Sequence, residues 1–522
     1  MPRSGSPPMT NRFLLLMGLV ALSAAIPAAQ PAPRRMASAQ PAEVSVDAGR
    51  LGQIDQIVAE GLEAKQMCGC VVLVGRRGKV VFLRAYGQRQ IEPDRVEMTT
   101  DTVFDLASLT KPVATATSVM ILMERGSLRL EDRVAKHIPE FGQNGKEDVT
   151  VFQLLTHQGG IVPDNPLADY ADGPEKAWQR IFALKPRVPP GSKFLYSDVG
   201  YLVLGELVRR VSGKNVHEFS RDNIFRPLGM DETGYLPEEN LRRRAAPTEK
   251  RAGAWIQGEV HDPRAYMLGG IAGHAGVFST AEDLAVYAQM MLNGGQIDGV
   301  RILKQETVAA MTRPYQVSGG VRGLAWDIQT GYSSNRGRSF SSRAFGHGGF
   351  TGTVIWMDPE LELLVIFLSS RLHPDGKGSV NPLAGRIGTV AADAIRDRTA
   401  PAAGGQGPGV RGQEVRMQNA ECRMQNAVDA DLHQSSIINQ QSAISNQQSS
   451  ISIQHSASPR VLTGIDVLRR DGFRLLAGRR VGLITNQTGV DRQGVSTARL
   501  LKASSAEFVG EFWLWEGSQC VI

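Results

Sequence analysis

The sequence lacks several patterns on which common protein classes depend. Its 522 residues hold only four cysteines, too few for the disulfide framework of a small secreted domain. It contains no His-Glu-x-x-His run and no histidine pair at metal-binding helical spacing, so we predict neither a metal nor another cofactor. Gly-x-Ser-x-Gly and Walker motifs are also absent, which argues against nucleophile-elbow hydrolases and P-loop proteins.

A large excess of positive charge is missing as well. The formal net charge is +6, but residues 1–40 contribute four arginines and no acid, so the rest of the chain carries only +2. Proteins that bind nucleic acid usually present a strongly basic surface. We therefore predict no nucleic-acid partner.

Long hydrophobic runs are confined to the N-terminus. Basic residues precede an apolar run at 13–26, which is too short to span a bilayer stably. We interpret residues 1–39 as a signal peptide, cleaved after Ala29 or Ala39, with an uncleaved anchor as the alternative. The protein is then exported to the periplasm or the medium and meets the membrane only through this segment.

The first ordered region is expected over residues 47–398. Apolar residues at helical spacing predict a helix at 51–65. Four apolar runs bounded by turn residues are predicted strands: 71–74, 80–83, 353–357 and 363–368. Strands at both ends of a helix-rich middle predict an α+β fold, with an antiparallel sheet flanked by helices plus a helical subdomain.

The composition changes sharply after this region. Residues 399–458 are rich in Gly and Pro and then in Gln, Ser and Asn, a composition that cannot bury enough apolar surface to fold, so we predict a disordered linker. Residues 459–503 regain an ordered character, with a buried strand expected at 480–484. Residues 504–522 do not continue that pattern and are interpreted as an aberrant tail.

The strongest chemical signal is Ser108-Leu-Thr-Lys111 at the start of a helical run that ends near Gly126. This spacing places both side chains on one helix face, one turn apart. A serine hydroxyl becomes a nucleophile when a nearby base takes its proton, and a lysine amine can do so if its pKa is lowered. The helix N-terminus favours developing negative charge.

Two further elements follow in order along the chain. Tyr196-Ser197-Asp198 precedes a helical run at 202–211, and His347-Gly348-Gly349 lies at the edge of the predicted strand 353–357. Ser-x-x-Lys alone is a weak signal, because this spacing arises often by chance. The three elements in this order are typical of β-lactamases and penicillin-binding proteins.

In these elements the chain resembles the serine β-lactamase-related family, which includes class C β-lactamases, D-alanyl-D-alanine carboxypeptidases, D-aminopeptidases and esterases. The resemblance covers about residues 47–398 and is carried by residues 104–111, 154–157, 190–198 and 346–352. It implies that Ser108 is acylated and that Lys111 and Tyr196 share the proton transfers. It also implies an oxyanion hole at the backbone N–H groups of Ser108 and Phe350, with Asp198, His347 and Gly349 completing the substrate site.

Three departures from the family pattern weaken an assignment as a β-lactamase. Asp198 replaces an asparagine and adds a negative charge that can keep Lys111 protonated. Gly348 replaces a threonine, and His347 stands where relatives place a lysine facing the substrate carboxylate, although histidine is a weaker anion receptor at neutral pH. We therefore expect slow or no turnover of cephalosporins.

Simpler roles remain open for several of these residues. Ser108 can be a helix cap, Tyr196 a packing residue and His347 a turn residue. The other conspicuous histidines, His157, His261 and His274, are expected to be structural. Cys68 and Cys70 share a strand face, where packing is favoured over a shared metal.

Residues 463–468 and 482–492 resemble the start of the exo-β-N-acetylmuramidase family, so residues 459–503 are interpreted as a truncated, inactive fragment of such a domain. This association favours peptidoglycan-derived peptides or small molecules as substrates. We predict a serine peptidase or amidase acting on cell-wall peptides. An esterase for small acyl esters and a penicillin-binding sensor without turnover remain alternatives, and the oligomeric state is left open.

Overall fold

The computed structural model describes residues 34–376, 378–397, 480–485 and 507–513. The chain divides into two units, residues 1–434 and 435–522, which are described separately. Most of the predicted signal peptide and all of the predicted linker lie outside the described residues. Within the described part, no helix combines the length and the apolar character needed to cross a bilayer.

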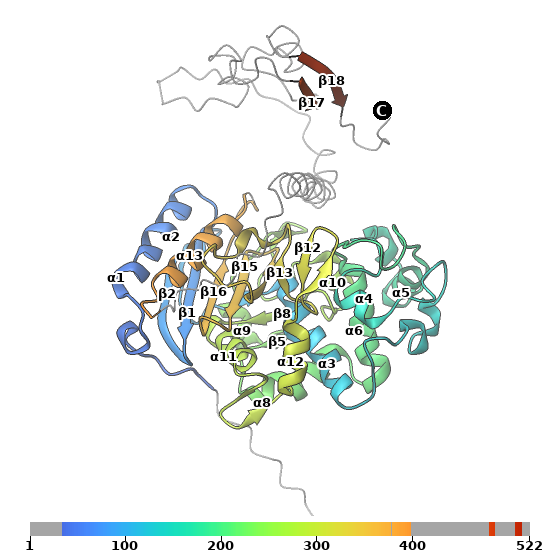
Figure 1. Cartoon of the computed structure of the whole chain (residues 1–522), viewed down its shortest axis with the longest axis horizontal. Coiled ribbons are helices and arrows are strands. Elements are labelled where there is room, and N and C mark those ends of the chain that lie inside the picture. Colours follow the sequence, from blue (N-terminus) through green and yellow to red (C-terminus); the bar gives the residue numbers. More distant parts are fainter. Residues whose placement is uncertain (1–33, 377, 398–479, 486–506, 514–522) are drawn as a thin grey trace, which may run out of the picture. The chain divides into compact units, whose positions relative to one another are not determined.

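The first unit is built on a nine-stranded sheet with the order β11-β12-β13-β14-β15-β16-β1-β2-β3 (Figure 1). Its strands are β1 (Gly69–Arg76), β2 (Lys79–Gln90), β3 (Val96–Glu97), β11 (Tyr315–Val317), β12 (Gly320–Arg322), β13 (Asp327–Gln329), β14 (Phe345–Gly349), β15 (Thr353–Asp358) and β16 (Leu363–Ser369). Every pair of neighbours is antiparallel. The predicted strands and the α+β class are confirmed.

Strands from the two ends of the unit meet in the middle of this sheet. β1 pairs with β16, with Val72 opposite Phe367 and Leu73 opposite Ile366. This pairing explains why the sequence shows apolar strands at both ends of a helix-rich middle. The chain segment between them supplies the helices and the residues of the candidate site.

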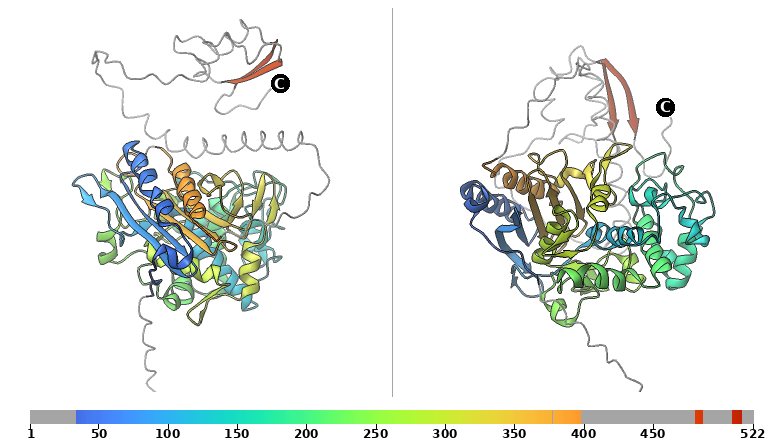
Figure 2. Two further views of the ribbon diagram at one scale, coloured as in Figure 1. Left: turned by 60° about the vertical axis from the view of Figure 1, so that its left-hand side comes forward. Right: turned by 60° about the horizontal axis from the view of Figure 1, so that its bottom comes forward.

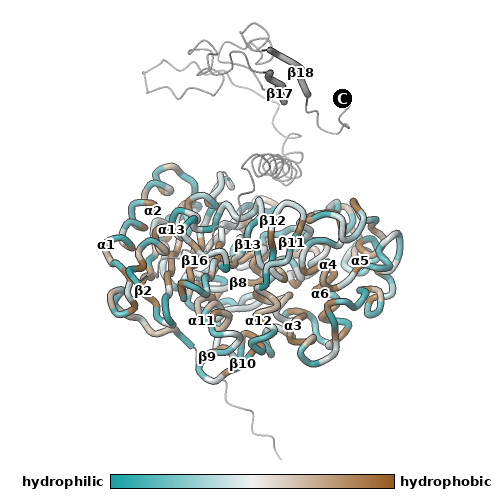
Figure 3. The backbone as a smooth tube through the Cα atoms, in the orientation of Figure 1, coloured by the Kyte–Doolittle hydropathy of each residue, from teal (hydrophilic) through white to brown (hydrophobic). Residues whose placement is uncertain are grey.

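Both faces of the central strands are buried, because the alternating side chains enter two separate cores. Leu73 and Ile366 belong to one hydrophobic cluster, whereas Val72 and Phe367 belong to the other. All residues of β1, β15 and β16 are buried, so these strands have continuous apolar sequences instead of alternating ones. Figure 3 shows hydrophobic stretches in this sheet and in the helices next to it.

Helices cover the two faces of the sheet unequally. α2 and α13 lie side by side over one face with α1, and α11 packs on the other (Figure 2). Helices α3 to α7 form the predicted helical subdomain beside the sheet (Figure 1). The helices are α1 (Ala48–Leu51), α2 (Gln53–Glu63), α3 (Thr117–Glu124), α4 (Val151–Leu155), α5 (Pro174–Ala183), α6 (Asp198–Ser212), α7 (Val216–Ser220), α8 (Arg226–Leu228), α9 (Glu239–Arg244), α10 (Pro263–Met267), α11 (Ala281–Leu292), α12 (Gln305–Thr312) and α13 (Asn381–Asp393).

Smaller sheets complete the first unit. β4 (Phe104–Asp105), β8 (Val277–Ser279) and β5 (Gly234–Tyr235) form one of them, and β4 lies directly before Ser108 in the chain. Two-stranded sheets are formed by β6 (Lys250–Arg251) with β7 (Ala254–Trp255), and by β9 (Gln296–Ile297) with β10 (Val300–Arg301).

The ordered structure begins earlier than the predicted start at residue 47. The backbone of residues 37–39 pairs with Val80 of β2. Arg35 forms ion pairs with Asp283 at 2.7 Å, Glu232 at 2.9 Å and Glu282 at 3.6 Å. A signal cleavage after Ala29 would retain these contacts, whereas one after Ala39 would remove them.

The second unit contains two described strands. β17 (Arg480–Thr485) confirms the strand expected at 480–484. β18 (Glu507–Trp513) pairs with it in parallel, although residues 504–522 were expected to be an aberrant tail.

We expect Arg35→Gln to lower the free energy of unfolding by about 1–2 kcal/mol, because it removes the cation beside the fully buried carboxylate of Asp283. Urea unfolding of the full chain near neutral pH measures the change. Arg133→Gln is the matched control, since its pair with Asp148 is solvent-exposed and contributes little. Equal effects of the two substitutions would contradict a structural role for residues 34–39.

Candidate functional site

Ser108 lies in a helical stretch whose first turn is under strain. A 3₁₀ turn at Ala107–Leu109 leads into a π-helical turn at Lys111–Ala116 and then into α3, so the predicted helix is present but irregular. Ala107 has a φ of +45°, a left-handed conformation that is unfavourable for alanine. Its N–H donates to the buried side chain of Asp105 at 2.8 Å, which holds the turn in place.

Lys111 is fully buried and surrounded by polar partners. Its Nζ lies 2.9 Å from Ser108 Oγ and donates to the carbonyl oxygen of His274 at 3.3 Å. Asp198 Oδ1 lies 2.5 Å from the same nitrogen. The predicted neighbours Ser108, Lys111 and Asp198 are therefore brought together.

The pKa of Lys111 is raised, contrary to the lowered value that a lysine base requires. Burial lowers the pKa, but the charge of Asp198 and interactions with Tyr196 outweigh it. The condition under which a lysine acts as a base, a lowered pKa, is therefore not met with Asp198 charged beside it. The expectation that Asp198 keeps the lysine protonated agrees with the geometry.

Tyr196 stands beside the ammonium group on a well-supported loop. Its ring centre lies 4.9 Å from Lys111 Nζ, and the imidazole of His157 stacks behind it at 4.3 Å. His157 Nδ1 accepts a hydrogen bond from the N–H of Ser197 at 3.0 Å. His157 therefore has the structural role expected from the sequence, and it fixes the loop that carries both Tyr196 and Asp198.

The end of β14 is fastened to the segment before Ser108. Thr351 Oγ1 donates to the carbonyl of Asp105 at 2.7 Å, and Thr353 Oγ1 donates to that of Leu106 at 3.0 Å. A Cβ on Gly349 would lie 2.4 Å from the Leu106 oxygen, so only glycine allows this approach. Phe350 follows on the exposed side of this junction.

His347 is buried on β14, and its ring is neutral. Burial, together with the charges of Arg322 and Lys111, moves its pKa well below the ordinary value. Its Nδ1 lies 2.7 Å from the carbonyl oxygen of Gly348, which fits an N–H donor at this position. A neutral imidazole offers hydrogen bonds but no positive charge, so His347 does not replace the lysine of the family as a cation.

Arg322 is a charged residue of the site that no sequence motif indicated. Its side chain is fully buried at the end of β12, with the guanidinium 5.2 Å from the ring centre of Phe194 and 6.0 Å from that of Tyr196. Asp327 lies 3.5 Å away. Long stretches of chain separate β12 from the segments of Ser108 and Tyr196. Arg322 therefore reaches the site through the order of the strands in the sheet, which the sequence does not show.

A second unpredicted group lies behind Lys111. His274 Nε2 is 2.9 Å from Asp262 Oδ1, and ligand atoms of these two residues and of Asp198 lie within 4.8 Å of one another. These residue types can bind a metal, but the ammonium of Lys111 already lies against Asp198 and supplies a positive charge there. His274 is almost fully buried, as expected of a structural histidine.

His261 and the two N-terminal cysteines also have structural surroundings. The N–H of His261 donates to Asp105 at 2.7 Å, and its ring stacks on Phe350 at 5.6 Å. Cys68 and Cys70 are free thiols, and burial raises the pKa of Cys68 to about 11. Packing is therefore the role that the structure gives these cysteines.

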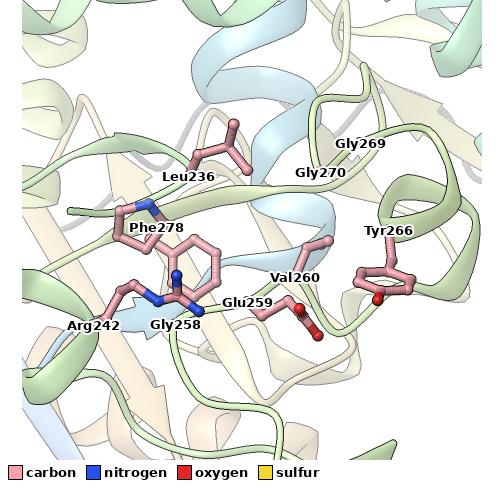
Figure 4. Close-up of a pocket in the computed structure, with 10 residues that line it drawn as sticks. Leu236, Arg242, Gly258, Glu259, Val260, Tyr266, Gly269, Gly270 and Phe278 are labelled. Atoms are coloured by element: carbon pink, nitrogen blue, oxygen red, sulfur yellow. The ribbon is translucent and has the colours of Figure 1, made fainter. Parts of the chain in front are cut away.

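Two cavities differ in their relation to these residues. One, of about 320 Å³, includes Tyr196 and the loop before it in its lining. The other, of about 310 Å³, lies between Leu236, Phe278 and Tyr266, with Arg242 and Glu259 at its wall (Figure 4). None of the predicted site residues lines the second cavity, so we assign the candidate site to the first.

Comparison with known proteins agrees with this geometry. The sequence model of the Beta-lactamase family matches residues 54–388, more than half of the chain. The chain belongs to the Beta-lactamase family. Members of this family are serine hydrolases, and the chain has their fold.

Individual relatives give the range of names in the family. A protein of Escherichia coli K12, whose name proposes a D-alanyl-D-alanine carboxypeptidase, is 30% identical over 400 residues, covering 70% of this chain and 91% of that protein. A Bacillus subtilis protein named N-acetylmuramyl-L-alanine amidase is 30% identical over 365 residues, covering 62% and 81%. The crystal structure of a penicillin-binding protein homologue from Caulobacter crescentus superposes with a TM-score of 0.54 at 22% identity, covering 67% and 99%, and shows the shared fold.

We expect His157 and His347 to remain neutral between about pH 5.5 and 8, because burial and the neighbouring cations depress the pKa of both. Histidine side-chain NMR shifts across this range measure it. In the unfolded chain these two histidines bind protons near pH 6.5, whereas in the folded protein they do not. Their contribution to the free energy of unfolding therefore falls as the pH drops below that value. A titration midpoint near 6.5 for either ring in the folded protein would contradict the assignment.

Proposed function

We propose that the chain is an exported serine amidase or peptidase that forms an acyl-enzyme on Ser108. The observation that carries this proposal is the buried Lys111 ammonium at 2.9 Å from Ser108 Oγ, with Asp198 at 2.5 Å on its other side. A nucleophile within hydrogen-bond reach of a group that becomes its base on losing a proton, with that group held by a third residue, is the arrangement that covalent catalysis needs. The predicted signal at residues 1–39 supports export.

The proton path follows from these contacts. The base in this path is the neutral amine of Lys111, which forms when the ammonium loses a proton to water. It takes the proton of Ser108 as the serine oxygen attacks the substrate carbonyl. The backbone N–H groups of Ser108 and Phe350 receive the negative charge on the carbonyl oxygen. Lys111 and Tyr196 return a proton to the leaving nitrogen, and water afterwards releases the acyl group through the same residues.

The names of the relatives guide the choice of substrate. Both the carboxypeptidase and the amidase names describe cleavage of an amide bond next to alanine. The resemblance of residues 459–503 to a muramidase points to the same material, peptidoglycan fragments. We therefore propose a cell-wall peptide containing alanine as the substrate, with a small acyl ester as the competing class.

We expect the full chain to form a stoichiometric adduct with a fluorophosphonate probe, visible by intact mass, and Ser108→Ala to abolish it. Amide hydrolysis should fall by more than about 1,000-fold in the same variant, because the covalent path is lost. Ser127→Ala, at an exposed serine outside the site, serves as the control. An adduct that survives in Ser108→Ala would overturn the assignment of the nucleophile.

A penicillin distinguishes the remaining alternatives in the same assay. An adduct that decays within minutes indicates an enzyme with turnover, whereas an adduct that persists indicates a sensor. Parallel rates on an alanyl amide and on the matching ester then decide between amidase and esterase.

The pH profile tests the role of Asp198. Its charge raises the pKa of Lys111, and the base is the neutral amine, so Asp198→Asn should populate that form at lower pH. In this variant, we expect the pH at which the rate of Ser108 labelling rises (the acid limb of the profile) to be lower by about 1–3 pH units. Asp148→Asn, at an exposed carboxylate, should leave the limb in place. A limb that stays in place or moves upward in Asp198→Asn would exclude this role.

A further inference from the structure

The cavity that includes Tyr196, here called the Tyr196 pocket, is built from three segments that are distant in sequence. The loop 187–196 supplies one side, the β11–β12 turn with Ser318 supplies another, and Tyr332 closes the third. Its volume of about 320 Å³ accommodates a part of a ligand of the size of one or two amino-acid residues. Because Tyr196 also faces Lys111, a substrate held at Ser108 can extend into this pocket.

The charge of the Tyr196 pocket is positive. Arg187 and Lys193 are exposed at its lining, and the ten residues that line it include no carboxylate. In the part of the chain that the structure describes, neither cation takes part in an ion pair. The buried guanidinium of Arg322 lies near the rings of Phe194 and Tyr196, but Asp327 pairs with it, so the positive charge of the pocket comes from Arg187 and Lys193.

The second cavity shows that this charge is not a general property of the surface. Its lining carries Arg242 together with Glu259, so its formal charge is balanced (Figure 4). The Tyr196 pocket carries two cations and no anion. Of these two cavities, the Tyr196 pocket is therefore the one that attracts a ligand with a negative charge.

Aromatic rings give the pocket an apolar wall beside its cations. Phe194 and Tyr332 meet edge to face at 6.0 Å, and Tyr332 lies 5.0 Å from Tyr196. About a third of Tyr332 is exposed, so part of its ring is open to a ligand. Such a wall packs against the aliphatic part of an amino-acid residue.

The backbone of the loop 187–196 is held in place without a ligand. Arg187 N–H donates to Gly160 at 2.8 Å, Gly191 N–H donates to Gln158 at 2.7 Å, and Leu195 N–H donates to His157 at 2.9 Å. Phe194 N–H donates to Ser318 Oγ at 2.7 Å and joins the loop to the β11–β12 turn. The loop is thus pre-organised, which reduces the entropy lost on binding.

We propose that the Tyr196 pocket binds a carboxylate-bearing residue of a peptide substrate, with Arg187 and Lys193 selecting the negative charge. This inference deepens the proposed function and rests on it, because it assumes that a peptide substrate is bound at Ser108. The acidic residue then belongs to the part of that peptide that lies beside Tyr196. The positive charges are contributed by the loop and not by His347, whose ring is neutral.

The test uses two capped peptides that differ by one charge, acetyl-Ala-Glu-Ala-amide and acetyl-Ala-Gln-Ala-amide, each made with L- and with D-configured second residues. Their Kd values are measured by calorimetry on the full-length Ser108→Ala protein, so that no turnover is needed. We expect the Glu peptide of one configuration to bind about 3–10-fold more tightly than its Gln twin, with a preference that shrinks as salt is added. Arg187→Gln combined with Lys193→Gln should remove the preference.

Lys185→Gln is the matched control, because this lysine is exposed close to the same loop but does not line the pocket. It should leave the preference unchanged. Equal affinity of the twins, no measurable binding of either Glu peptide, or a preference that survives the double substitution would overturn the proposal. On the active chain, the double variant should raise KM for the Glu peptide more than KM for the Gln peptide. Formation of the Ser108 adduct is scored separately, so failure of the acyl-enzyme proposal and failure of the pocket proposal remain distinguishable.

Discussion

The ammonium group of Lys111 has no exposed surface, and this burial constrains the elements around it. An unpaired ammonium in such a place costs several kcal/mol, so a carboxylate has to be held beside it. Asp198 provides that charge from the first residue of α6. The α6 N-terminus is fixed in turn, because Ser197 caps the helix through Gly200 N–H and donates its own hydroxyl proton to Val162.

The chain just before Lys111 carries a local strain that its neighbours offset. Ala107, next to Ser108, has a left-handed conformation, which costs about 1–2 kcal/mol. Asp105 offsets this cost by accepting hydrogen bonds from Ala107 and from His261. The threonines that follow Gly349 then bind the backbone carbonyls of Asp105 and Leu106, so the strained turn and the end of β14 hold each other.

The sequence was sufficient for the elements that depend on local pattern. The strands at both ends of the first unit follow from apolar runs, and the grouping of Ser108, Lys111, Tyr196 and Asp198 follows from motif order. It was not sufficient for quantities that depend on burial. The Ser-x-x-Lys spacing does not determine whether Asp198 comes within 2.5 Å of Lys111 and raises its pKa. The position of His347 in the sequence likewise does not determine that burial lowers the pKa of its ring.

Arg322 and the Asp262–His274 pair were missed for a different reason. They reach the site through the order of strands in the sheet and through the loop before β8, neither of which has a local signature. The contacts of residues 35–39 were missed because the acidic partners of Arg35 on α11 are about 250 residues away in the sequence. Sequence patterns describe each segment, whereas these contacts depend on how distant segments meet.

The charges of the cleft divide into groups that titrate and groups that do not. His157 and His347 are neutral through the physiological range, and the arginines near Tyr196 remain positive at any pH at which the protein is folded. The attraction that we propose for an anionic substrate therefore stays constant with pH near neutrality. The charge of Asp198 raises the pKa of Lys111, so a change of pH acts at Ser108 through the fraction of neutral lysine amine and not through the rings of His157 or His347.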